Sequence, residues 1–282
     1  MCSNMRMIDS PRFVKWAGGK QQLIEQFKPL FPKKFNNYLE LFVGSGAVAF
    51  YIIQKFNPQN VLLSDINVEL INAFNIIKSD VKTLIVKLKQ HKESHLTLRE
   101  KYYYNVRSIN PNNLPDLERA ARFIYLNKTC FNGLYRVNSK DGFNVPMGSY
   151  KNPDIVQEEK LKRISNLLKN VTLKVMSFEK IVDIAKERDF IYLDPPYFPL
   201  KKGKNFTTYT KDNFLEKEQK LLTDTFKKLD KKGCLCMESN SDTKFIKNLY
   251  ANFNISFVRA KRLINSDAQG RGEINEIVIT NY

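Results

Sequence analysis

Apolar residues recur along the chain at two spacings, and the change from one spacing to the other predicts strands separated by helices. An apolar strand is expected over residues 38–42, followed by a Gly-rich turn and an apolar helix over residues 47–55. A second strand over residues 61–64 ends directly at Asp65. Strand, turn, helix, strand and acidic residue in this order describe one βαβ unit.

The middle of the chain follows a different pattern. Apolar positions recur at helical spacing from about residue 67 to residue 104, and another helix is predicted over residues 118–129. Between residues 131 and 150, Asn-Gly, Asp-Gly and Met-Gly steps separate short extended pieces, which is typical of a hairpin or loop. We interpret this stretch, ending near residue 157, as a module inserted into the alternating pattern.

Strand character returns after the module. The predicted strands are residues 171–176, 189–193, 233–238, 255–261 and 274–280, with an amphipathic helix over 216–229 and a polar, Lys-rich loop over 200–211. Taken with the first βαβ unit, this alternation predicts an α/β fold with a doubly wound sheet.

Net charge adds a prediction about the partner. Among 282 residues, 46 Lys and Arg oppose 29 Asp and Glu, which gives a formal net charge of +17. This exceeds the magnitude of about 2–8 common for a small soluble domain, so a polyanionic partner such as nucleic acid is favoured. The alternative is a compositional bias toward lysine, which the charge alone does not exclude.

Two further features exclude other classes of protein. The longest uninterrupted apolar run, residues 47–53, is far too short to span a bilayer, and residues 1–12 carry no apolar signal core. Cys234 and Cys236 alternate within an apolar strand, and Cys2 and Cys130 show no pairing pattern. We therefore expect a cytoplasmic protein with reduced cysteines and no membrane anchor.

The turn after the first strand is the first candidate for chemistry. Gly44 and Gly46 lie between a strand and a helix, where glycine lets a ligand approach the backbone and the helix offers free N–H groups. Asp65 follows Gly44 by 21 residues, a spacing typical of an acid that binds ribose hydroxyls. A plain tight turn and a helix-capping acid are the structural alternatives. The combination favours a ligand that contains a nucleoside.

The sequence Asp194-Pro195-Pro196-Tyr197, at the end of a predicted strand, is the most specific feature. Two prolines fix two φ angles and remove two N–H donors. The Asp194 carboxylate and the Pro195 carbonyl then become two acceptors on a stiff turn, which suits a planar amine, and Tyr197 adds an aromatic face for a base. A simple Pro-Pro turn at a strand end would leave the acid and the tyrosine unexplained.

Together these segments resemble the Dam-like family of S-adenosylmethionine-dependent DNA adenine methyltransferases, in the α group of amino-methyltransferases. The matching segments are residues 13–20 (FVKWAGGK), 40–46 (ELFVGSG), 64–67 (SDIN), 132–138 (NGLYRVN), 143–146 (FNVP) and 194–197 (DPPY). The resemblance implies a Rossmann-like methyltransferase sheet formed by residues 1–67 and 158–282. It also implies an inserted, mostly helical DNA-recognition domain, residues 68–157, which carries a β-hairpin.

The resemblance assigns roles to matching positions. Those implied to bind S-adenosylmethionine are Trp16, Lys20, Phe42, Gly44, Gly46, Asp65 and Asp194, and the implied catalytic turn is Asp194, Pro195, Pro196 and Tyr197. Core packing for a lone Trp and a solvated surface for a lone Lys are the alternatives. Acceptors at Asp194 and Pro195 would hold the adenine amine so that its nitrogen lone pair attacks the methyl group directly.

The resemblance also implies that the partner is double-stranded DNA, read in a GATC sequence after one adenine is flipped out of the stack. The implied DNA contacts are Lys15, Phe131, Asn132, Leu134, Arg136, Asn138 and Pro146. Phe131 would be the wedge in the stack, and some relatives have Tyr there. Arg136 suits bidentate recognition of guanine, with a phosphate contact or a plain surface position as alternatives.

Other interpretations remain open from sequence. An RNA or protein amine methyltransferase would share the catalytic turn, and an inactive DNA-binding relative would share the fold. No metal is expected, because His91 and His95, four residues apart, lack a third ligand and fit a plain helix surface better. The loop at 201–211 would either cover the target base or be a solvated surface loop. We expect a monomer of bacterial or phage type, in either a restriction–modification or a solitary role.

Overall fold

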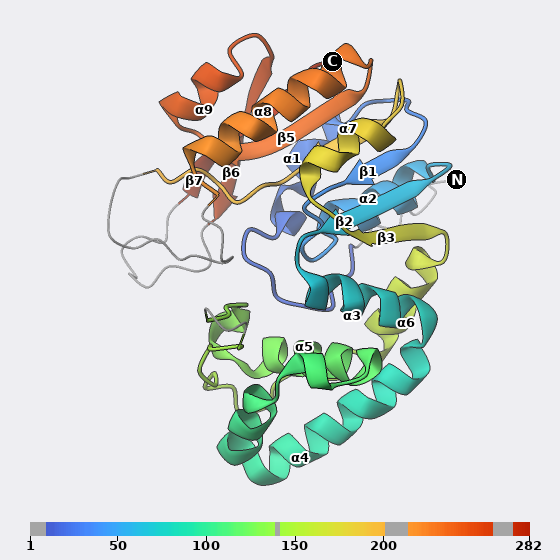
Figure 1. Cartoon of the computed structure of the whole chain (residues 1–282), viewed down its shortest axis with the longest axis vertical. Coiled ribbons are helices and arrows are strands. Elements are labelled where there is room, and N and C mark those ends of the chain that lie inside the picture. Colours follow the sequence, from blue (N-terminus) through green and yellow to red (C-terminus); the bar gives the residue numbers. More distant parts are fainter. Residues whose placement is uncertain (1–9, 139–141, 201–213, 262–272) are drawn as a thin grey trace, which may run out of the picture.

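The computed structural model describes residues 10–138, 142–200, 214–261 and 273–282. Its centre is a seven-stranded sheet in the order β3-β2-β1-β4-β5-β7-β6 (Figure 1). The strands are β1 (Tyr38–Glu40), β2 (Val61–Asp65), β3 (Val171–Val175), β4 (Phe190–Leu193), β5 (Leu235–Ser241), β6 (Asn254–Lys261) and β7 (Glu273–Thr280). Each predicted strand is present, with bounds that differ by a few residues, and the predicted α/β fold class is confirmed.

The directions of the strands determine at which edge of the sheet a ligand is expected to bind. Strands β1 to β5 pair in parallel, while β7 is antiparallel to both of its neighbours, β5 and β6. The first five strands have the order of a doubly wound nucleotide-binding sheet, in which ligands bind at the carboxyl ends where the strand order reverses. Here the reversal falls between β1 and β4, so the segments that follow these two strands meet at one edge.

Both faces of the sheet are buried, as the continuous apolar runs in the sequence require. Along β4, Phe190 and Tyr192 face one core and Ile191 and Leu193 face the other. The first core includes α1 (Ile24–Phe27) and α2 (Ala47–Phe56), and the second includes α7 (Ile181–Ile184), α8 (Glu216–Lys231) and α9 (Lys244–Leu249). The sheet is therefore the middle of three layers.

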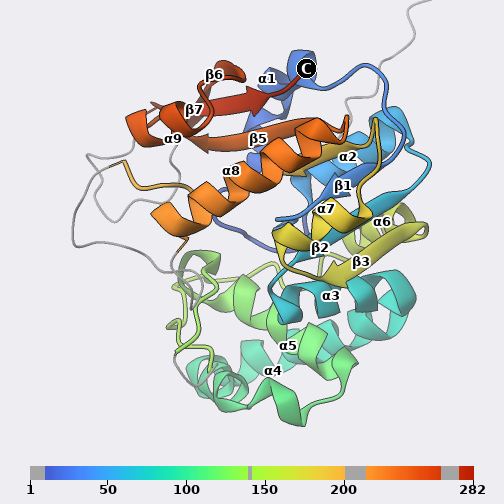
Figure 2. The ribbon, with the colours of Figure 1, turned by 45° about the horizontal axis from the view of Figure 1, so that its top comes forward.

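A helical unit follows β2. It comprises α3 (Val68–Ser79), α4 (Val81–Ser108) and α5 (Asp116–Thr129), which lie together on one side of the sheet, and α6 (Glu158–Leu168), which leads back into β3 (Figure 2). Phe74 of α3 packs edge-on against Phe13, with ring centroids 4.8 Å apart, and also contacts Phe50 of α2. One continuous apolar core thus runs from the sheet into the helical unit.

Several expectations for the helices needed correction. The helical stretch predicted from about residue 67 to 104 is interrupted twice. Asp80 ends α3 and its side chain accepts from Thr83 N to cap α4, and α4 is kinked at Arg99, which has φ of 45°. Sequence analysis did not identify α6 or the short helices of four to six residues, α1, α7 and α9.

No helix in the described part of the chain is long and apolar enough to cross a membrane. The predicted loop at 201–211 lies outside the described residues.

Candidate active site

The loop between β1 and α2 is shaped by Trp16. Gly44 has φ of 48°, and a Cβ at this position would lie 2.8 Å from Cδ1 of Trp16. The half-buried Trp16 ring therefore packs against backbone that only glycine leaves open. Gly46 has φ of 76° and lies directly before the first residue of α2. Phe42, in the same loop, packs against Phe178.

Asp65 lies at the carboxyl end of β2, beside this loop. Its Oδ2 accepts from Gly44 N at 3.3 Å and its Oδ1 accepts from Asn67 N at 3.0 Å. Burial raises the pKa of Asp65 to about 6, although these hydrogen bonds oppose the rise. The capping alternative is wrong for Asp65, because Asn67 is the residue whose side chain caps α3 through Leu70 N.

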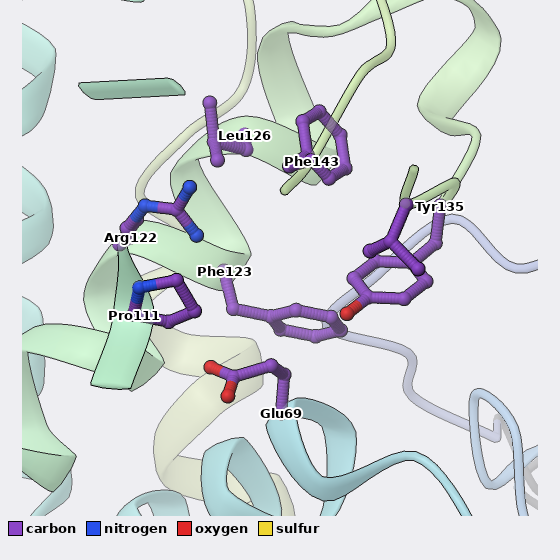
Figure 3. Close-up of a pocket in the computed structure, with 8 residues that line it drawn as sticks. Glu69, Pro111, Arg122, Phe123, Leu126, Tyr135 and Phe143 are labelled. Carbon is purple, nitrogen blue, oxygen red and sulfur yellow. The ribbon is translucent and has the colours of Figure 1, made fainter. Parts of the chain in front are cut away.

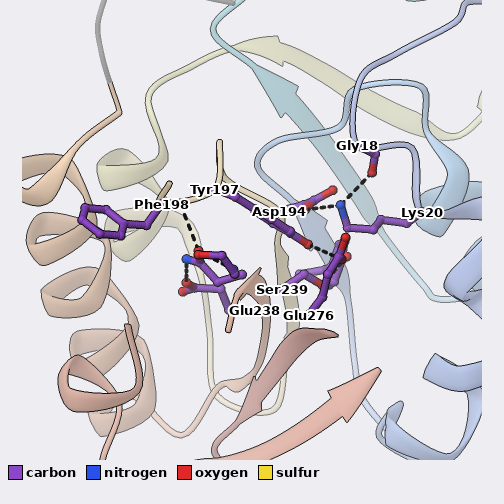
Figure 4. A network of polar contacts seen from close by, with 11 residues as sticks. Gly18, Lys20, Asp194, Tyr197, Phe198, Glu238, Ser239 and Glu276 are labelled. Atoms are coloured by element: carbon purple, nitrogen blue, oxygen red, sulfur yellow. Dashed lines mark hydrogen bonds and ion pairs between the residues drawn. The ribbon is translucent and has the colours of Figure 1, made fainter. Parts of the chain in front are cut away.

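Asp194 follows β4 and forms an ion pair with Lys20. Nζ of Lys20 lies 2.8 Å from Oδ1 of Asp194 and donates to the Gly18 carbonyl at 2.7 Å (Figure 4). The Lys20 side chain is only 4% exposed, so the alternative of a solvated surface lysine is wrong. Burial raises the pKa of Asp194 to about 6, and the Lys20 charge limits the rise.

Tyr197 is held through its ring and through its hydroxyl group. Nζ of Lys20 lies 4.6 Å from the centroid of its ring, and its hydroxyl donates to Oε2 of Glu276 at 2.8 Å. Burial, with the charges of Asp194 and Glu276, raises the pKa of Tyr197 well above its ordinary value, so the phenol keeps its proton. A cavity of about 170 Å³ lies beside the ring and is lined by Tyr197, Phe198, Pro199, Leu200, Ser241, Asn275 and Glu276.

The segment that carries Trp16 is tied to the helical unit. Asn127 of α5 accepts from Lys15 N and donates to the Lys15 carbonyl, both at 2.8 Å, and also donates to the Gly133 carbonyl at 3.0 Å. The Trp16 ring stacks on Tyr135, with centroids 6.0 Å apart and planes 26° apart. Packing thus connects the Gly44 loop to the segment around residue 135.

The predicted hairpin is present in outline. Antiparallel bridges pair Cys130 with Met147 and Val137 with Phe143. Arg136 is exposed, and its Nε and Nη2 donate to the side chain and carbonyl oxygens of Asn144 at 2.7 and 3.3 Å. The other predicted DNA contacts gather in the same segment except Lys15, which packs over Gly133. Exposed on this segment are Phe131, Asn132, Asn138 and Pro146, while Leu134 is half-buried.

A second, much smaller cavity lies behind Tyr135. It measures about 10 Å³ and is enclosed by α3, α5 and the hairpin, with Glu69, Arg122 and Phe123 among its lining residues (Figure 3). This volume suits about one water molecule, so it is not a nucleotide site. Arg119 forms an ion pair with Glu69 nearby and fastens α5 to α3.

The histidine pair is structural. His95 is buried, contrary to the expected plain helix surface, and its Nδ1 lies 2.9 Å from the Tyr125 hydroxyl. His91 stacks on the same tyrosine with centroids 4.8 Å apart, and burial lowers its pKa to about 4. Among the residues that the structure describes, no three His, Cys, Asp or Glu side chains form a group that could hold a metal ion.

Sequence analysis missed three residues that contact the turn. Gln219 Nε2 donates to the Pro196 carbonyl at 3.0 Å, Asn240 Oδ1 accepts from Phe198 N, and Glu276 binds Tyr197. One signal was available, because Gln219 lies on the buried face of an amphipathic helix with Leu222 and Phe226. A polar residue on such a face needs a hydrogen-bonding partner.

Comparison with known proteins identifies the family of this chain. Residues 16–264 match the family model "D12 class N6 adenine-specific DNA methyltransferase". The chain is 44% identical to the type II methyltransferase M.MjaIII of Methanocaldococcus jannaschii, covering 96% of this chain and 98% of that protein. It is 42% identical to the type II methyltransferase M1.LlaDCHI of Lactococcus lactis subsp. cremoris, with 96% and 95% covered. It is 36% identical to the DNA adenine methylase of Haemophilus influenzae, with 94% and 92% covered.

An Asp-Pro-Pro-Tyr turn and a Gly-rich loop lie together at the switch point of a doubly wound sheet, where α/β folds bind their ligands. The chain belongs to the D12 class of N6 adenine-specific DNA methyltransferases. The predicted family is therefore confirmed, with an adenine of DNA as its substrate.

Proposed function

We propose that this enzyme transfers a methyl group from S-adenosylmethionine to the exocyclic amine of a flipped adenine in duplex GATC. The observation that carries the proposal is the position of Asp194. Its carboxylate lies at the carboxyl end of β4, paired with Lys20 and followed by two prolines that leave acceptors and no N–H donors. This arrangement suits an amine that donates two hydrogen bonds.

The residues at the strand ends fit the cofactor. Asp65, partly buried at the end of β2, suits ribose hydroxyls, and the glycines of the Gly44 loop let a ligand approach its backbone. Lys20 supplies a buried cation for the methionine carboxylate, and Phe42 and Gly46 complete the loop. When bound, S-adenosylmethionine supplies an electrophilic methyl group.

The chain's own residues position and polarise the amine. The Asp194 carboxylate and the Pro195 carbonyl accept its two hydrogens, which favours a tetrahedral nitrogen and concentrates the lone pair that is otherwise delocalised into the ring. The Tyr197 ring, held by Lys20 and Glu276, offers a fixed face on which the flipped base stacks. The rate enhancement comes mainly from orientation and electrostatics.

Recognition of GATC is assigned to the hairpin. The bonds of Arg136 to Asn144 use Nε and one hydrogen of Nη2, and these bonds orient the guanidinium so that its end-on edge, Nη1 and Nη2, suits the O6 and N7 acceptors of guanine. Phe131, 51% exposed, suits a wedge between base pairs. Lys15, Asn132, Leu134, Asn138 and Pro146 are proposed as the remaining contacts.

Residues 68–157 are proposed as the recognition domain, inserted between the two parts of the catalytic domain, 1–67 and 158–282. A monomer is proposed as the active unit, because one hairpin and one catalytic turn in the same chain make a complete site.

The test is transfer of labelled methyl groups to matched duplexes with and without GATC, with an RNA of the same sequence as control. The wild-type enzyme is expected to label only the GATC duplex. Asp194→Ala should lose about a hundred- to a thousandfold in rate, since it removes one of two acceptors at the reacting nitrogen. Equal labelling of both duplexes would overturn the GATC assignment, and near wild-type transfer by Asp194→Ala would overturn the mechanism.

A further inference from the structure

Two buried carboxamide side chains form hydrogen bonds with the backbone of the proposed catalytic turn. Gln219 of α8 and Asn240 of β5 are both fully buried, at 0% exposure. Gln219 Nε2 donates to the Pro196 carbonyl at 3.0 Å, and Asn240 Oδ1 accepts from Phe198 N at 3.4 Å. The backbone is thus held immediately before and immediately after Tyr197, from outside the Asp194–Tyr197 turn itself.

The carboxamides also fix one another. Asn240 Nδ2 donates to Oε1 of Gln219 and to Oε1 of Glu238, each at 3.0 Å, and the Tyr250 hydroxyl donates to Oε2 of Glu238 at 2.5 Å (Figure 4 shows this region). Both hydrogens of the Asn240 amide are used, and its oxygen also accepts from Ser241 N. The network therefore admits one orientation of each amide, with the Gln219 nitrogen toward Pro196.

The turn needs such support because of its prolines. Pro195 and Pro196 have no N–H, so neighbouring backbone cannot hold this part of the turn through amide donors. Their rings fix φ but leave ψ, and ψ decides where each carbonyl points. A donor on the Pro196 carbonyl therefore restrains ψ of Pro196 directly. Because the Pro196 ring fixes its φ, the same bond also limits movement of the preceding peptide, whose carbonyl belongs to Pro195.

We propose that Gln219 and Asn240 are positioning residues for methyl transfer, which set the Asp194–Tyr197 turn by holding the Pro196 carbonyl and the Phe198 amide. This inference rests on the proposed role of the turn as the amine site. Neither carboxamide touches the substrate. Their loss moves the two acceptors relative to the amine, and a displacement of about 1 Å can reduce a rate about a hundredfold.

Gln219→Met is the direct test, since methionine keeps the length of the side chain and removes both polar atoms. The single-turnover rate constant of methyl transfer should fall about 10- to 100-fold. The dissociation constants for S-adenosylmethionine and for a GATC duplex should change less than about threefold, because the groups that bind them are elsewhere. A rate constant equal to that of the wild type would overturn the proposal.

Thr225→Val is the matched control. Thr225 is buried on the same helix, and its hydroxyl donates to the Leu221 carbonyl at 2.9 Å, away from the turn. This variant removes a buried hydroxyl without changing the turn, so it should keep the wild-type rate constant. A loss as large as that of Gln219→Met would assign the effect to helix stability and reject a positioning role.

If the methionine variant does not fold, Gln219→Glu tests the positioning role instead. A protonated acid still donates to the Pro196 carbonyl, whereas an ionised one cannot, and burial raises the pKa of such an acid. The rate constant relative to wild type should therefore rise as the pH falls from about 8 to about 6. Glu238, Tyr250 and Asp194, the titratable groups around the network, are common to both proteins, so their titration largely cancels in the ratio.

A ratio that does not change with pH would contradict the proposal. The result is separable from the proposed function, because an active Gln219→Met together with an inactive Asp194→Ala rejects only the positioning role. Methyl transfer by Asp194→Ala would instead reject the amine site itself.

Discussion

Asp194 carries two opposing demands. In the proposed mechanism the carboxylate must be ionised to accept fully from the amine, yet its partly buried position raises its pKa to about 6, with Lys20 opposing the rise. Since the ionised form dominates only above this pKa, the residue is near its titration midpoint in mildly acidic conditions.

The pH dependence of methyl transfer follows from this value. The ratio kcat/KM for DNA, measured at saturating S-adenosylmethionine so that DNA-free enzyme is sampled, should rise through a midpoint of about 6 and level off above it. Asp194→Asn should be slow and should not show this rise. A wild-type kcat/KM that stays level across the same range would show that Asp194 does not titrate there.

The residues that could be predicted from sequence are those in contiguous motifs. Asp194, Asp65 and Gly44 were recognisable because they lie at or shortly after the carboxyl ends of strands, within short sequence motifs. Gln219 and Glu276 were not, since they reach the turn from 23 and 79 residues away along the chain. Contacts of that separation depend on tertiary packing, and no local pattern reveals them.

At the scale of elements, the segment around Lys15 packs against the start of the hairpin. Gly133 has φ of 65°, and a Cβ there would lie 2.4 Å from Cβ of Lys15. Asn127 bonds both partners, so the segment before Trp16 and the start of the hairpin are fixed together.

Gly133→Ala should therefore destabilise the fold by about 1–3 kcal/mol, through the left-handed backbone and the clash with Lys15. Thermal unfolding measures the loss, and affinity for a GATC duplex should weaken with it, since Lys15 and the hairpin separate. Gly142→Ala is the control, because the atoms nearest to its Cβ would belong to the Asn138 side chain, with the closest at 3.1 Å. Equal midpoints for the two variants would show that the close approach is not needed.

Elements differed in how well sequence predicted them. The parallel strands were recognisable because burial on both faces demands continuous apolar runs, as in β4. Short helices such as α7 and α9 were missed, since four to six residues are too few to show helical periodicity. The 68–157 domain boundaries remain a prediction, and α6 continues the apolar core past the second of them.

At the scale of the whole molecule, charge and recognition make separate contributions. The net charge of +17 favours any DNA through its phosphates, whereas the proposed role of the exposed Arg136 edge is to contact one base. Affinity should therefore respond mainly to the salt concentration, and sequence specificity mainly to the Arg136 side chain.

Binding measured by fluorescence anisotropy on GATC and scrambled duplexes should weaken steeply for both between about 50 and 200 mM salt. Arg136→Ala should reduce the ratio of the two affinities by about 10- to 100-fold, equivalent to about 1–3 kcal/mol, and should change the salt slope by at most about 1. An unchanged ratio with a much shallower slope would assign Arg136 to phosphate binding instead.

The apolar core that joins the sheet to the helical unit also limits how this enzyme can diverge. Exchanging the helices for those of a relative would disrupt packed contacts such as Phe13 on Phe74 and Trp16 on Tyr135. We therefore expect that the helical unit cannot be exchanged without loss of stability. Exposed hairpin positions such as Arg136 and Phe131 have no such constraint. Under the proposed role of the hairpin, new target sequences are therefore expected to arise by single substitutions on it, with the helices beneath it left in place.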